Sequence, residues 1–482
     1  MSEMKSLAKD TAIYGLSSII GKFLNYLLVP LYTYVLARTE DYGIVTNLYA
    51  WTALLLVILT YGMETGFFRF ANREGYDPKS VYKTAYLTLF TTSALFTLLV
   101  VVFRQPLSAT LGYADHSEFV AMMFATVAVD AFASIPFAYL RNQKRPIVFA
   151  ALKLLFVVLN IGFNILFLVV LGKNDVFYVF LSNLLATGIQ TICLLPMTLP
   201  KGGRFQGQTL REMLRYSLPL LVLGVAGIMN QTLDRILFPY LYPGEDAQAQ
   251  LGIYGACFKV AMVMLMFTQA FRYAYEPFVF AKHKDRQSVE AYADAMKYYI
   301  IFSYLILLGV IFYLDIFRYI VSSAYWEGLK IVPVVLWTYV FQGVYFNLSF
   351  WYKLTDETKW GAYFSLIGLV ITLVLQIVGV PRIGYWASCG SSLVCYFVIM
   401  VLSYFIGQKK APIPYDLKSI GSYTVLTIGL LAFYYAIRLY YVHNMWLLMA
   451  IGTVLLTLYL IIMVRRDFPL SGLPVVGKYF RN

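Results

Sequence analysis

Fourteen apolar windows, each about 20 residues long, constrain the fold of this chain more than any other feature of its sequence. A helix needs ~20 apolar residues to cross the ~30 Å hydrocarbon core of a bilayer. Because lipid offers the backbone no hydrogen-bond partners, such segments must be helical. The sequence therefore predicts an all-α polytopic membrane protein with about 14 transmembrane helices. The predicted spans lie at 12–36, 42–66, 82–103, 118–140, 146–171, 175–199, 214–241, 251–276, 297–321, 329–352, 359–380, 383–407, 416–440 and 443–464.

The basic residues give the orientation of these spans. With the N-terminus placed in the cytoplasm, the inner segments contain 26 of the 38 Lys and Arg residues, the outer segments seven and the spans five. This distribution follows the positive-inside rule. We therefore expect both termini to be cytoplasmic. The same bias accounts for the net charge of +13, so we predict no nucleic-acid partner.

A weak internal repeat relates the seventh and eighth spans to the first and second. Tyr42-Gly43-Ile44 and Leu251-Gly252-Ile253 are separated by an offset of 209 residues. Transporters are often built from such repeats, with the substrate site at the repeat interface. We predict two six-helix lobes related by pseudo-two-fold symmetry, at residues 1–200 and 201–410. Two further helices and a cytoplasmic tail follow in residues 411–482.

We assign nine charged side chains to the predicted spans and count the other charged residues near the span ends with the loops. Each ionised group at the bilayer centre costs at least ~3 kcal/mol, so such residues usually line a polar cavity or a substrate path. The pattern is typical of a transporter and unexpected in a purely structural membrane protein. The nine residues are Lys22, Glu64, Asp130, Lys153, Asp234, Arg235, Lys259, Arg272 and Glu276.

Several motifs give the chain a family resemblance. They include Asp41-Tyr42-Gly43-Ile44, Gly62-Met63-Glu64-Thr65-Gly66, Asn230-Gln231-Thr232-Leu233-Asp234-Arg235, the run from Leu251 to Phe278, Tyr352-Lys353-Leu354-Thr355 and Gly384-Tyr385-Trp386-Ala387. The chain resembles the Wzx-type oligosaccharide flippases, a polysaccharide-biosynthesis branch of the multidrug/oligosaccharidyl-lipid/polysaccharide exporter superfamily.

That resemblance implies a MATE-like, V-shaped pair of lobes around a central cavity, in the cytoplasmic (inner) membrane of a bacterium. It implies alternating-access transport of a polyprenyl-pyrophosphate-linked oligosaccharide, such as an O-antigen, capsule or exopolysaccharide repeat unit. Its implied partners are this glycan, membrane lipids, and the glycan polymerase and glycosyltransferases of the same pathway.

Cations and amides inside the spans are the candidate substrate-binding residues. Phosphates favour Arg and Lys donors. We expect Lys22 to contact the pyrophosphate, because it lies too deep in its span to reach the surface. Other members of the set could instead reach the surface or join helices. The full set is Lys22, Asn25, Lys153, Asn160, Asn164, Arg235 and Lys259, of which Lys153, Asn160 and Asn164 form one helical stripe.

Asp130 and Asp234 each have two possible roles. Asp130 is either a structural partner for Lys22 or a site that couples transport to a Na⁺ or H⁺ gradient. Asp234 is either part of a structural ion pair or a coupling site. We expect no other cofactor and no metal site. A cytoplasmic gate is predicted from Glu64, Arg69, Arg272 and Glu276, although Arg272 and Glu276 also suit a local i,i+4 ion pair.

Two other functions remain open at this point. A cation-coupled multidrug or small-molecule exporter would have the same architecture, but cations slightly outnumber acids in these spans. A membrane glycan polymerase or glycosyltransferase generally needs a larger outer loop than the one containing Glu245 and Asp246. We therefore predict a transporter with no catalytic residues. Drug tolerance and surface glycan in a deletion strain would distinguish the two kinds of exporter.

Overall fold

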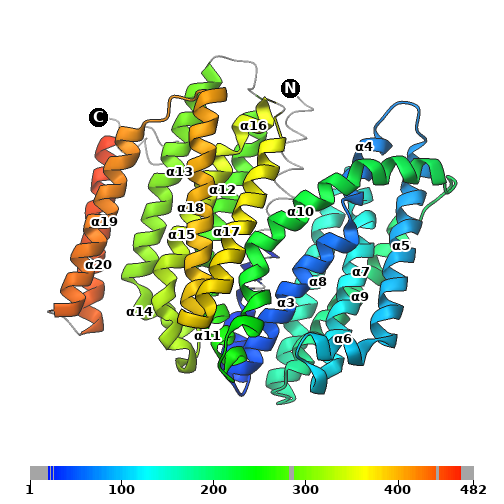
Figure 1. Cartoon of the computed structure of the whole chain (residues 1–482), viewed down its shortest axis with the longest axis horizontal. Coiled ribbons are helices and arrows are strands. Elements are labelled where there is room, and N and C mark those ends of the chain that lie inside the picture. The colour runs from blue at the N-terminus through cyan, green and yellow to red at the C-terminus, as the bar shows by residue number, and fades with distance from the viewer. Residues whose placement is uncertain are drawn as a thin grey trace. The chain divides into compact units, whose positions relative to one another are not determined.

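The computed structural model describes residues 20–21, 23–24, 26–281, 287–355, 357–440 and 444–467, except for the side chains of 274, 276–281, 287 and 288. Every regular element within these residues is a helix, as predicted (Figure 1). Twelve helices are long and apolar enough to cross a membrane, and a bent pair makes a thirteenth span. These thirteen correspond to the second through fourteenth predicted spans. Of the first, α2 (Leu28–Val35) falls within the described residues.

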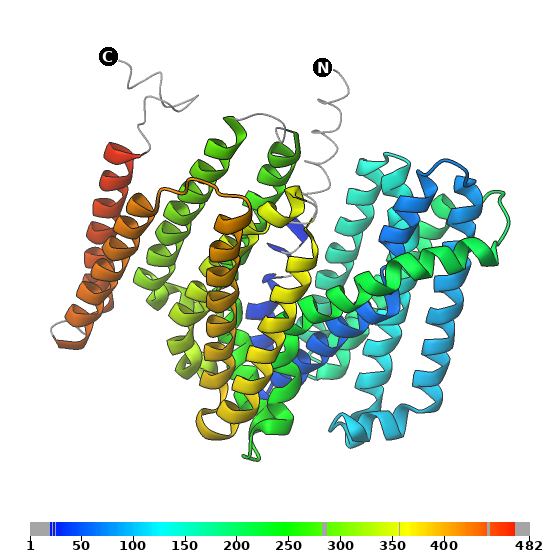
Figure 2. The same cartoon turned by 45° about the horizontal axis from the view of Figure 1, so that its top comes forward.

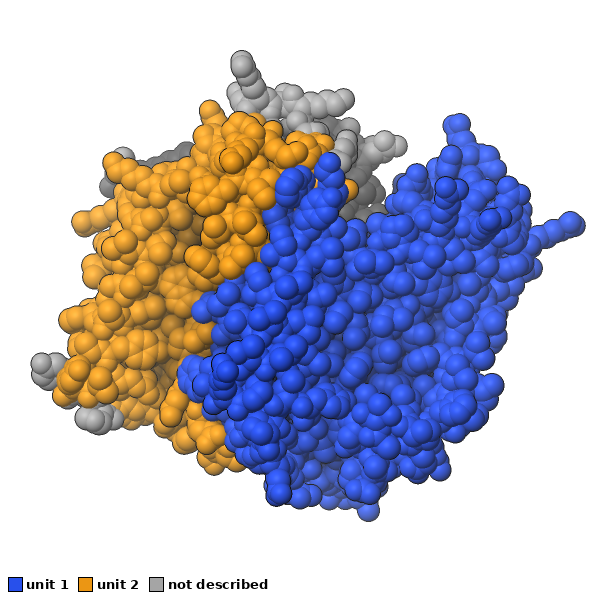
Figure 3. Space-filling view, in the orientation of Figure 1, with its two compact units in different colours: residues 1–259, 359–395 blue, residues 260–358, 396–482 orange. Residues whose placement is uncertain are grey.

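The helices divide into two compact units, coloured separately in Figure 3. Unit 1 comprises residues 1–259 and 359–395, and unit 2 comprises 260–358 and 396–482. The units do not coincide with the predicted lobes, because α10, α11 and α17 belong to unit 1. The lobe boundaries at 200 and 410 thus stay a prediction based on the repeat.

Unit 1 is built around α7, whose buried face is contacted by α3, α5, α8 and α9. The long helix α10 contacts α3, α4, α5 and α17, and Figures 1 and 2 show it running obliquely across its neighbours. The bounds are α3 (Thr39–Thr60), α4 (Met63–Ala71), α5 (Pro78–Val102), α6 (Arg104–Thr110), α7 (Ser117–Asn142), α8 (Pro146–Asn164), α9 (Val176–Thr198), α10 (Gly207–Leu241), α11 (Ala247–Val260) and α17 (Lys359–Ile383).

Buried amides join the helices of unit 1. The Gln190 side chain donates to the Leu152 carbonyl at 2.9 Å, which connects α9 to α8. The Asn230 side chain donates to the Ser365 carbonyl at 2.9 Å, which connects α10 to α17. Interhelical hydrogen bonds of this kind contribute ~0.6 kcal/mol each in membrane proteins. Much of the packing therefore depends on close contact between the helices themselves.

The predicted repeat appears in unit 1 as a reciprocal contact between α3 and α11. A Cβ added to Gly43 would overlap the Gln248 carbonyl, and one added to Gly252 would overlap the Thr39 carbonyl. With the offset of 209 residues, Thr39 corresponds to position 248 and Gly43 corresponds to Gly252, so each glycine contacts the counterpart of the other glycine's partner. Such exchange of partners is the signature of a two-fold interface. Gly255 faces Thr46, its own counterpart, so the local pseudo-two-fold axis passes between these two residues.

We expect Gly43→Ala and Gly252→Ala to destabilise the protein by similar amounts. Each new methyl group would meet a backbone carbonyl that cannot rotate away, and overpacking of this kind costs ~1–3 kcal/mol. Gly162→Ala in α8 is the control, because no neighbouring atom lies within 4 Å of its added Cβ. Thermal unfolding of the three variants in detergent is the measurement. Equal melting temperatures for all three would contradict the close crossing.

Unit 2 is built around α13 (Gln287–Phe312), which contacts α12 (Met262–Ala281), α15 (Val332–Leu348) and the hairpin of α19 (Leu417–Tyr440) and α20 (Met445–Arg466). Figures 1 and 2 both show α19 and α20 side by side. The remaining long helix, α18 (Tyr385–Lys410), continues from unit 1 into unit 2.

Ion pairs join the hairpin to α13 and its continuation at both ends. Asp467 lies 3.4 Å from the Lys297 ammonium and accepts a hydrogen bond from the Tyr423 hydroxyl at 2.8 Å. At the opposite end, Arg438 donates to Asp315 at 3.0 Å. The last two spans are thereby fixed to the rest of unit 2 at both ends of the hairpin.

Candidate functional site

A break in the second span shapes the candidate site. Helix α3 ends at Thr60, and α4 begins at Met63. Between them, Tyr61 has φ +33° and Gly62 has φ +70°. A bulky residue rarely adopts this left-handed conformation, which typically costs ~1–3 kcal/mol and clusters at functional sites. Discontinuous membrane helices also line transport sites in many folds. Here the break places Glu64 in the first turn of α4.

One cavity lies beside this break, and we call it the Asp130 cavity. Its volume is about 470 Å³, and helices α3, α4, α7, α8 and α9 form its walls. Phenylalanine rings supply much of its apolar surface. Its polar and aromatic lining consists of Thr60, Glu64, Asp130, Ser134, Phe137, Arg141, Phe149, Lys153, Phe156 and Gln190.

The charges of the Asp130 cavity are only partly paired. Arg141 contacts Glu64 at 2.5 Å. The Lys153 ammonium lies 3.9 Å from the centre of the Phe137 ring, a cation–π contact. Asp130 interacts electrostatically with Lys153. Among the described residues, however, neither of the two has an ion-pair partner within 4.0 Å. An acid and a cation thus face one cavity without neutralising each other through direct contact.

A second cavity, the Lys259 cavity, has a volume of about 290 Å³. Phe156 lines both cavities, so α8 borders the two. Within the part of the chain that the structure describes, this lining contains two cations and no acid, together with amides, hydroxyls and tyrosine rings. Its polar and aromatic members are Tyr32, Tyr42, Thr46, Tyr49, Phe156, Asn160, Asn183, Thr232, Arg235 and Lys259.

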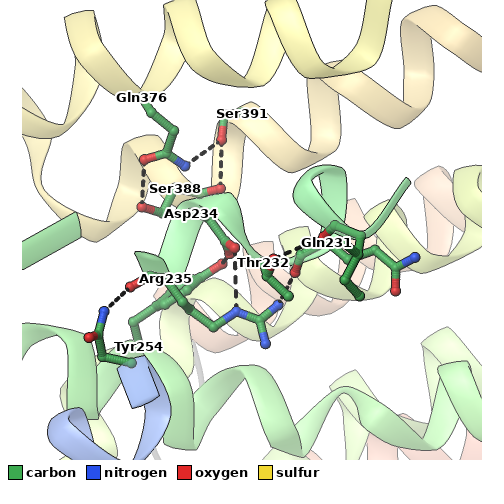
Figure 4. Close-up of polar contacts among 10 residues, drawn as sticks. Gln231, Thr232, Asp234, Arg235, Tyr254, Gln376, Ser388 and Ser391 are labelled. Carbon is green, nitrogen blue, oxygen red and sulfur yellow. Dashed lines mark hydrogen bonds and ion pairs between the residues drawn. The ribbon is translucent and has the colours of Figure 1, made fainter. Parts of the chain in front are cut away.

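Asp234 does not line the Lys259 cavity, but it forms an ion pair with Arg235, which does. Figure 4 shows this pair. Asp234 is 3% exposed, and its carboxylate accepts hydrogen bonds from the Tyr254 hydroxyl at 2.5 Å and from Arg235 Nε at 3.4 Å. The other end of the guanidinium donates to the Gln231 carbonyl at 2.6 Å. Arg235 is therefore fixed in the cavity wall while its charge is partly offset.

Lys259 has no such acid. Among the described residues, no carboxylate lies within 4.0 Å of its ammonium, and the ammonium donates no hydrogen bond to any of them. Its neighbours in the cavity wall include the cation Arg235 and the Asn160 side chain. Lys259 is half-buried in this wall, and a charge removed from water without a partner is costly, so an anion in the cavity would stabilise it. The electrostatics of this cavity therefore favour an anion.

A buried polar cluster lies on α17 and α18 near this network (Figure 4). The Gln376 amide donates to Ser391 Oγ at 2.9 Å and accepts from Ser388 Oγ at 3.1 Å. All three side chains are fully buried or nearly so. Because these groups satisfy one another, we assign the cluster to joining α17 and α18 rather than to binding.

The structure brings several predicted residues together. Glu64, Asp130 and Lys153 line the Asp130 cavity, and Asn160, Arg235 and Lys259 line the Lys259 cavity. Others lie elsewhere. Asn164 is buried and donates to the Asn160 carbonyl at 2.7 Å, so it belongs to the helix packing. Asp234 lies outside both linings and forms an ion pair with its sequence neighbour Arg235 at 3.4 Å.

The predicted gate is only partly described. The Arg69 guanidinium stacks on the Tyr216 ring at 4.1 Å, and Arg272 stacks on Phe346 at 4.5 Å within unit 2. The Glu276 side chain lies outside the described residues, as do Lys22 and Asn25. The gate, the Lys22–Asp130 pair and the pyrophosphate contact of Lys22 stay predictions.

Sequence reasoning missed several lining residues. Arg141 is not among the predicted site residues, yet it lines the Asp130 cavity. Asn183 and Gln190 line different cavities from the same helix, α9. They are seven residues apart, as are Lys153 and Asn160 on α8. Polar residues at this spacing in an apolar span are the signal that would have found them.

Comparisons with known proteins agree with this architecture. The family model described as "Polysaccharide biosynthesis protein" matches residues 7–275. A structure of the lipid II flippase MurJ in an inward closed conformation has a TM-score of 0.72 at 14% identity, covering 94% of this chain and 98% of that one. An inward-facing multidrug resistance MATE transporter has a TM-score of 0.65 at 12% identity, covering 86% and 96%.

A MOP superfamily transporter from Pyrococcus furiosus has a TM-score of 0.55 at 14% identity, covering 83% of this chain and 95% of that one. No curated protein has a significant match to the chain. The chain therefore has the same fold as this flippase and these transporters. Since the family model covers more than half of the sequence, the chain belongs to the polysaccharide biosynthesis protein family.

Proposed function

We propose that this protein is a flippase that moves a polyprenyl-pyrophosphate-linked oligosaccharide across the cytoplasmic membrane of a bacterium by alternating access. The lining of the Lys259 cavity carries the proposal, because its described residues include two cations and no acid. Arg and Lys donors suit phosphate oxygens. The amides and tyrosine rings in the same wall suit the hydroxyls and apolar faces of a sugar.

The Asp130 cavity supports a second step in the same route. Phe156 borders both cavities, so a headgroup leaving one meets the wall of the other. Here the cations are accompanied by Glu64 and Asp130. A phosphate should bind less tightly in this mixed environment than beside Lys259. We propose that the Asp130 cavity transiently admits the headgroup and that Asp130 takes up the coupling proton or Na⁺.

The family and the fold support the wider assignment. In this proposal both termini are cytoplasmic, and the substrate comes from glycosyltransferases and goes to a glycan polymerase of the same pathway. The glycan is an O-antigen, capsule or exopolysaccharide repeat unit. The fold shared with the lipid II flippase fits a lipid-linked substrate.

Export of cationic drugs is the second candidate, because MATE multidrug transporters share the fold. A deletion strain separates the two functions. Loss of surface glycan with unchanged drug tolerance supports the flippase, whereas lost tolerance with normal glycan identifies a drug exporter. Purified protein in liposomes that contain a fluorescent polyprenyl-pyrophosphate oligosaccharide provides the direct test. Failure of the label to change leaflets would overturn the proposal.

A further inference from the structure

Unit 2 contains an apolar cavity that the proposed transport route does not use. Its volume is about 300 Å³, at the lower end of the ~300–1,000 Å³ typical of ligand pockets. Helices α13, α15, α18 and α19 form its walls, and we call it the α13–α19 slot. The residues of α13 and α19 that line it are Met296, Ile300, Tyr304, Leu417, Ile420 and Thr424.

The interior of the slot presents almost only hydrocarbon. Met296, Ile300 and Tyr304 follow one another at intervals of four and therefore share a helix face. The Tyr304 hydroxyl and Thr424 Oγ1 form a hydrogen bond of 2.8 Å, which satisfies both groups. Val344 and Val401 complete the apolar wall. A flexible hydrocarbon chain fits this lining, whereas a sugar or a peptide backbone would lose hydrogen bonds there.

The rim of the slot is exposed on the outside of the unit. Phe405 is 60% exposed and Leu417 is 54% exposed, although both line the slot. These residues belong to predicted membrane spans or their immediate ends, so hydrocarbon chains of the bilayer surround the opening. The slot is thus open to membrane lipid.

Two lysines lie where α18 ends and α19 begins. Lys409 follows Phe405 by four residues on α18, and Lys418 follows Leu417 on α19. Among the described residues, neither has an acidic partner within 4.0 Å, whereas Lys410 is paired with Glu357. The neighbouring acid, Asp416, is occupied by the α19 N-terminus, since it accepts from the Ser419 amide at 3.0 Å. Lys409 and Lys418 therefore remain available to a phosphate.

We propose that the α13–α19 slot binds one acyl chain of an anionic phospholipid, whose phosphate lies at the Lys409 and Lys418 end. The apolar lining selects the chain and the two lysines select the charge. The Tyr304–Thr424 hydrogen bond closes the slot within the membrane, so it accommodates a short part of a chain rather than a long polyprenyl tail. This inference is independent of the transported substrate.

Native mass spectrometry of the full-length protein with phosphatidylglycerol or phosphatidylcholine of equal chain length tests the proposal. Two lysines near a membrane surface should favour phosphatidylglycerol by about thirtyfold. Val344→Trp fills the slot and should remove binding of both lipids. The double variant Lys409→Ala/Lys418→Ala should still bind lipid but lose the preference. Val425→Trp, at a 72% exposed position on α19 outside the slot, should bind as the natural protein does.

Equal retention of the two phospholipids by the natural protein would overturn the proposal, as would preferential binding of polyprenyl phosphate. So would unchanged phosphatidylglycerol binding in Val344→Trp. If Val344→Trp does not fold, Ile420→Phe narrows the same slot with a smaller change in volume. Loss of binding in Ile420→Phe, with a melting temperature equal to that of Val425→Trp, supports the slot. Unchanged binding in a folded Ile420→Phe protein contradicts it.

Discussion

Replacing Lys259 by alanine is expected to remove most transport of a lipid-linked oligosaccharide while leaving the protein in the membrane at its normal level. Hydrogen bonds to charged groups contribute ~1.5–3 kcal/mol, so the loss of one lysine–phosphate contact should reduce the rate about tenfold to one-hundredfold. No carboxylate among the described residues contacts Lys259, and removing its charge leaves no buried acid unpaired. Folding should therefore be unaffected or slightly improved. Flipping of a labelled substrate in liposomes is the measurement.

Two further variants make this result specific. Lys259→Arg keeps the charge and should retain a large part of the activity. Lys330→Ala removes an exposed lysine outside both cavities and should behave as the natural protein does. Normal surface glycan in a strain that carries Lys259→Ala at normal level would show that Lys259 does not bind the substrate. Loss of activity in Lys330→Ala would instead show that removing any positive charge lowers the flipping rate, wherever the lysine lies.

Replacing Asp130 by asparagine is expected to make the rate of flipping independent of an imposed Na⁺ or H⁺ gradient. The amide has nearly the same shape as the carboxyl group but cannot exchange a proton or hold a Na⁺ ion by charge. If Asp130 couples transport to an ion gradient, the rate of gradient-driven flipping should fall at least about tenfold in the variant. Flipping without a gradient should remain. Both rates are measured in liposomes with and without an imposed Na⁺ or H⁺ gradient.

The melting temperature distinguishes coupling from a structural role for Asp130. A coupling residue should tolerate asparagine, because a neutral amide is cheaper to bury than a carboxylate. A structural partner of a buried lysine should not, since the variant would leave that lysine uncompensated. Ser134→Ala, one turn further along α7 and in the same cavity, is the control. A folded Asp130→Asn protein with fully gradient-dependent flipping would exclude the coupling role.

Composition and hydropathy were enough to predict the fold class and the position of thirteen spans. This success has a physical reason, since the bilayer permits few alternatives to apolar helices. The repeat was also detectable, because the close crossing of the two helices leaves no room for a side chain at Gly43 or Gly252.

The walls of the cavities could not be predicted in the same way. Tyr32, Tyr42 and Tyr49 line the Lys259 cavity, but an aromatic residue in an apolar span equally suits packing or contact with lipid. The pairing of Arg235 with Asp234 depends on side-chain rotamers, which helical spacing does not determine. Gly62 is a recognisable helix breaker, whereas nothing in the sequence requires the left-handed conformation of Tyr61.

The reciprocal crossing of α3 and α11 has an evolutionary consequence. If the two halves of the chain descend from one duplicated gene, this crossing was once an interface between two identical subunits. A residue on the axis of such a dimer meets its own copy. Threonine on both sides would not fit, because a side chain at position 255 would overlap Thr46. A small residue in both subunits suits such an axis, and fusion of the two halves then permits threonine on one side alone.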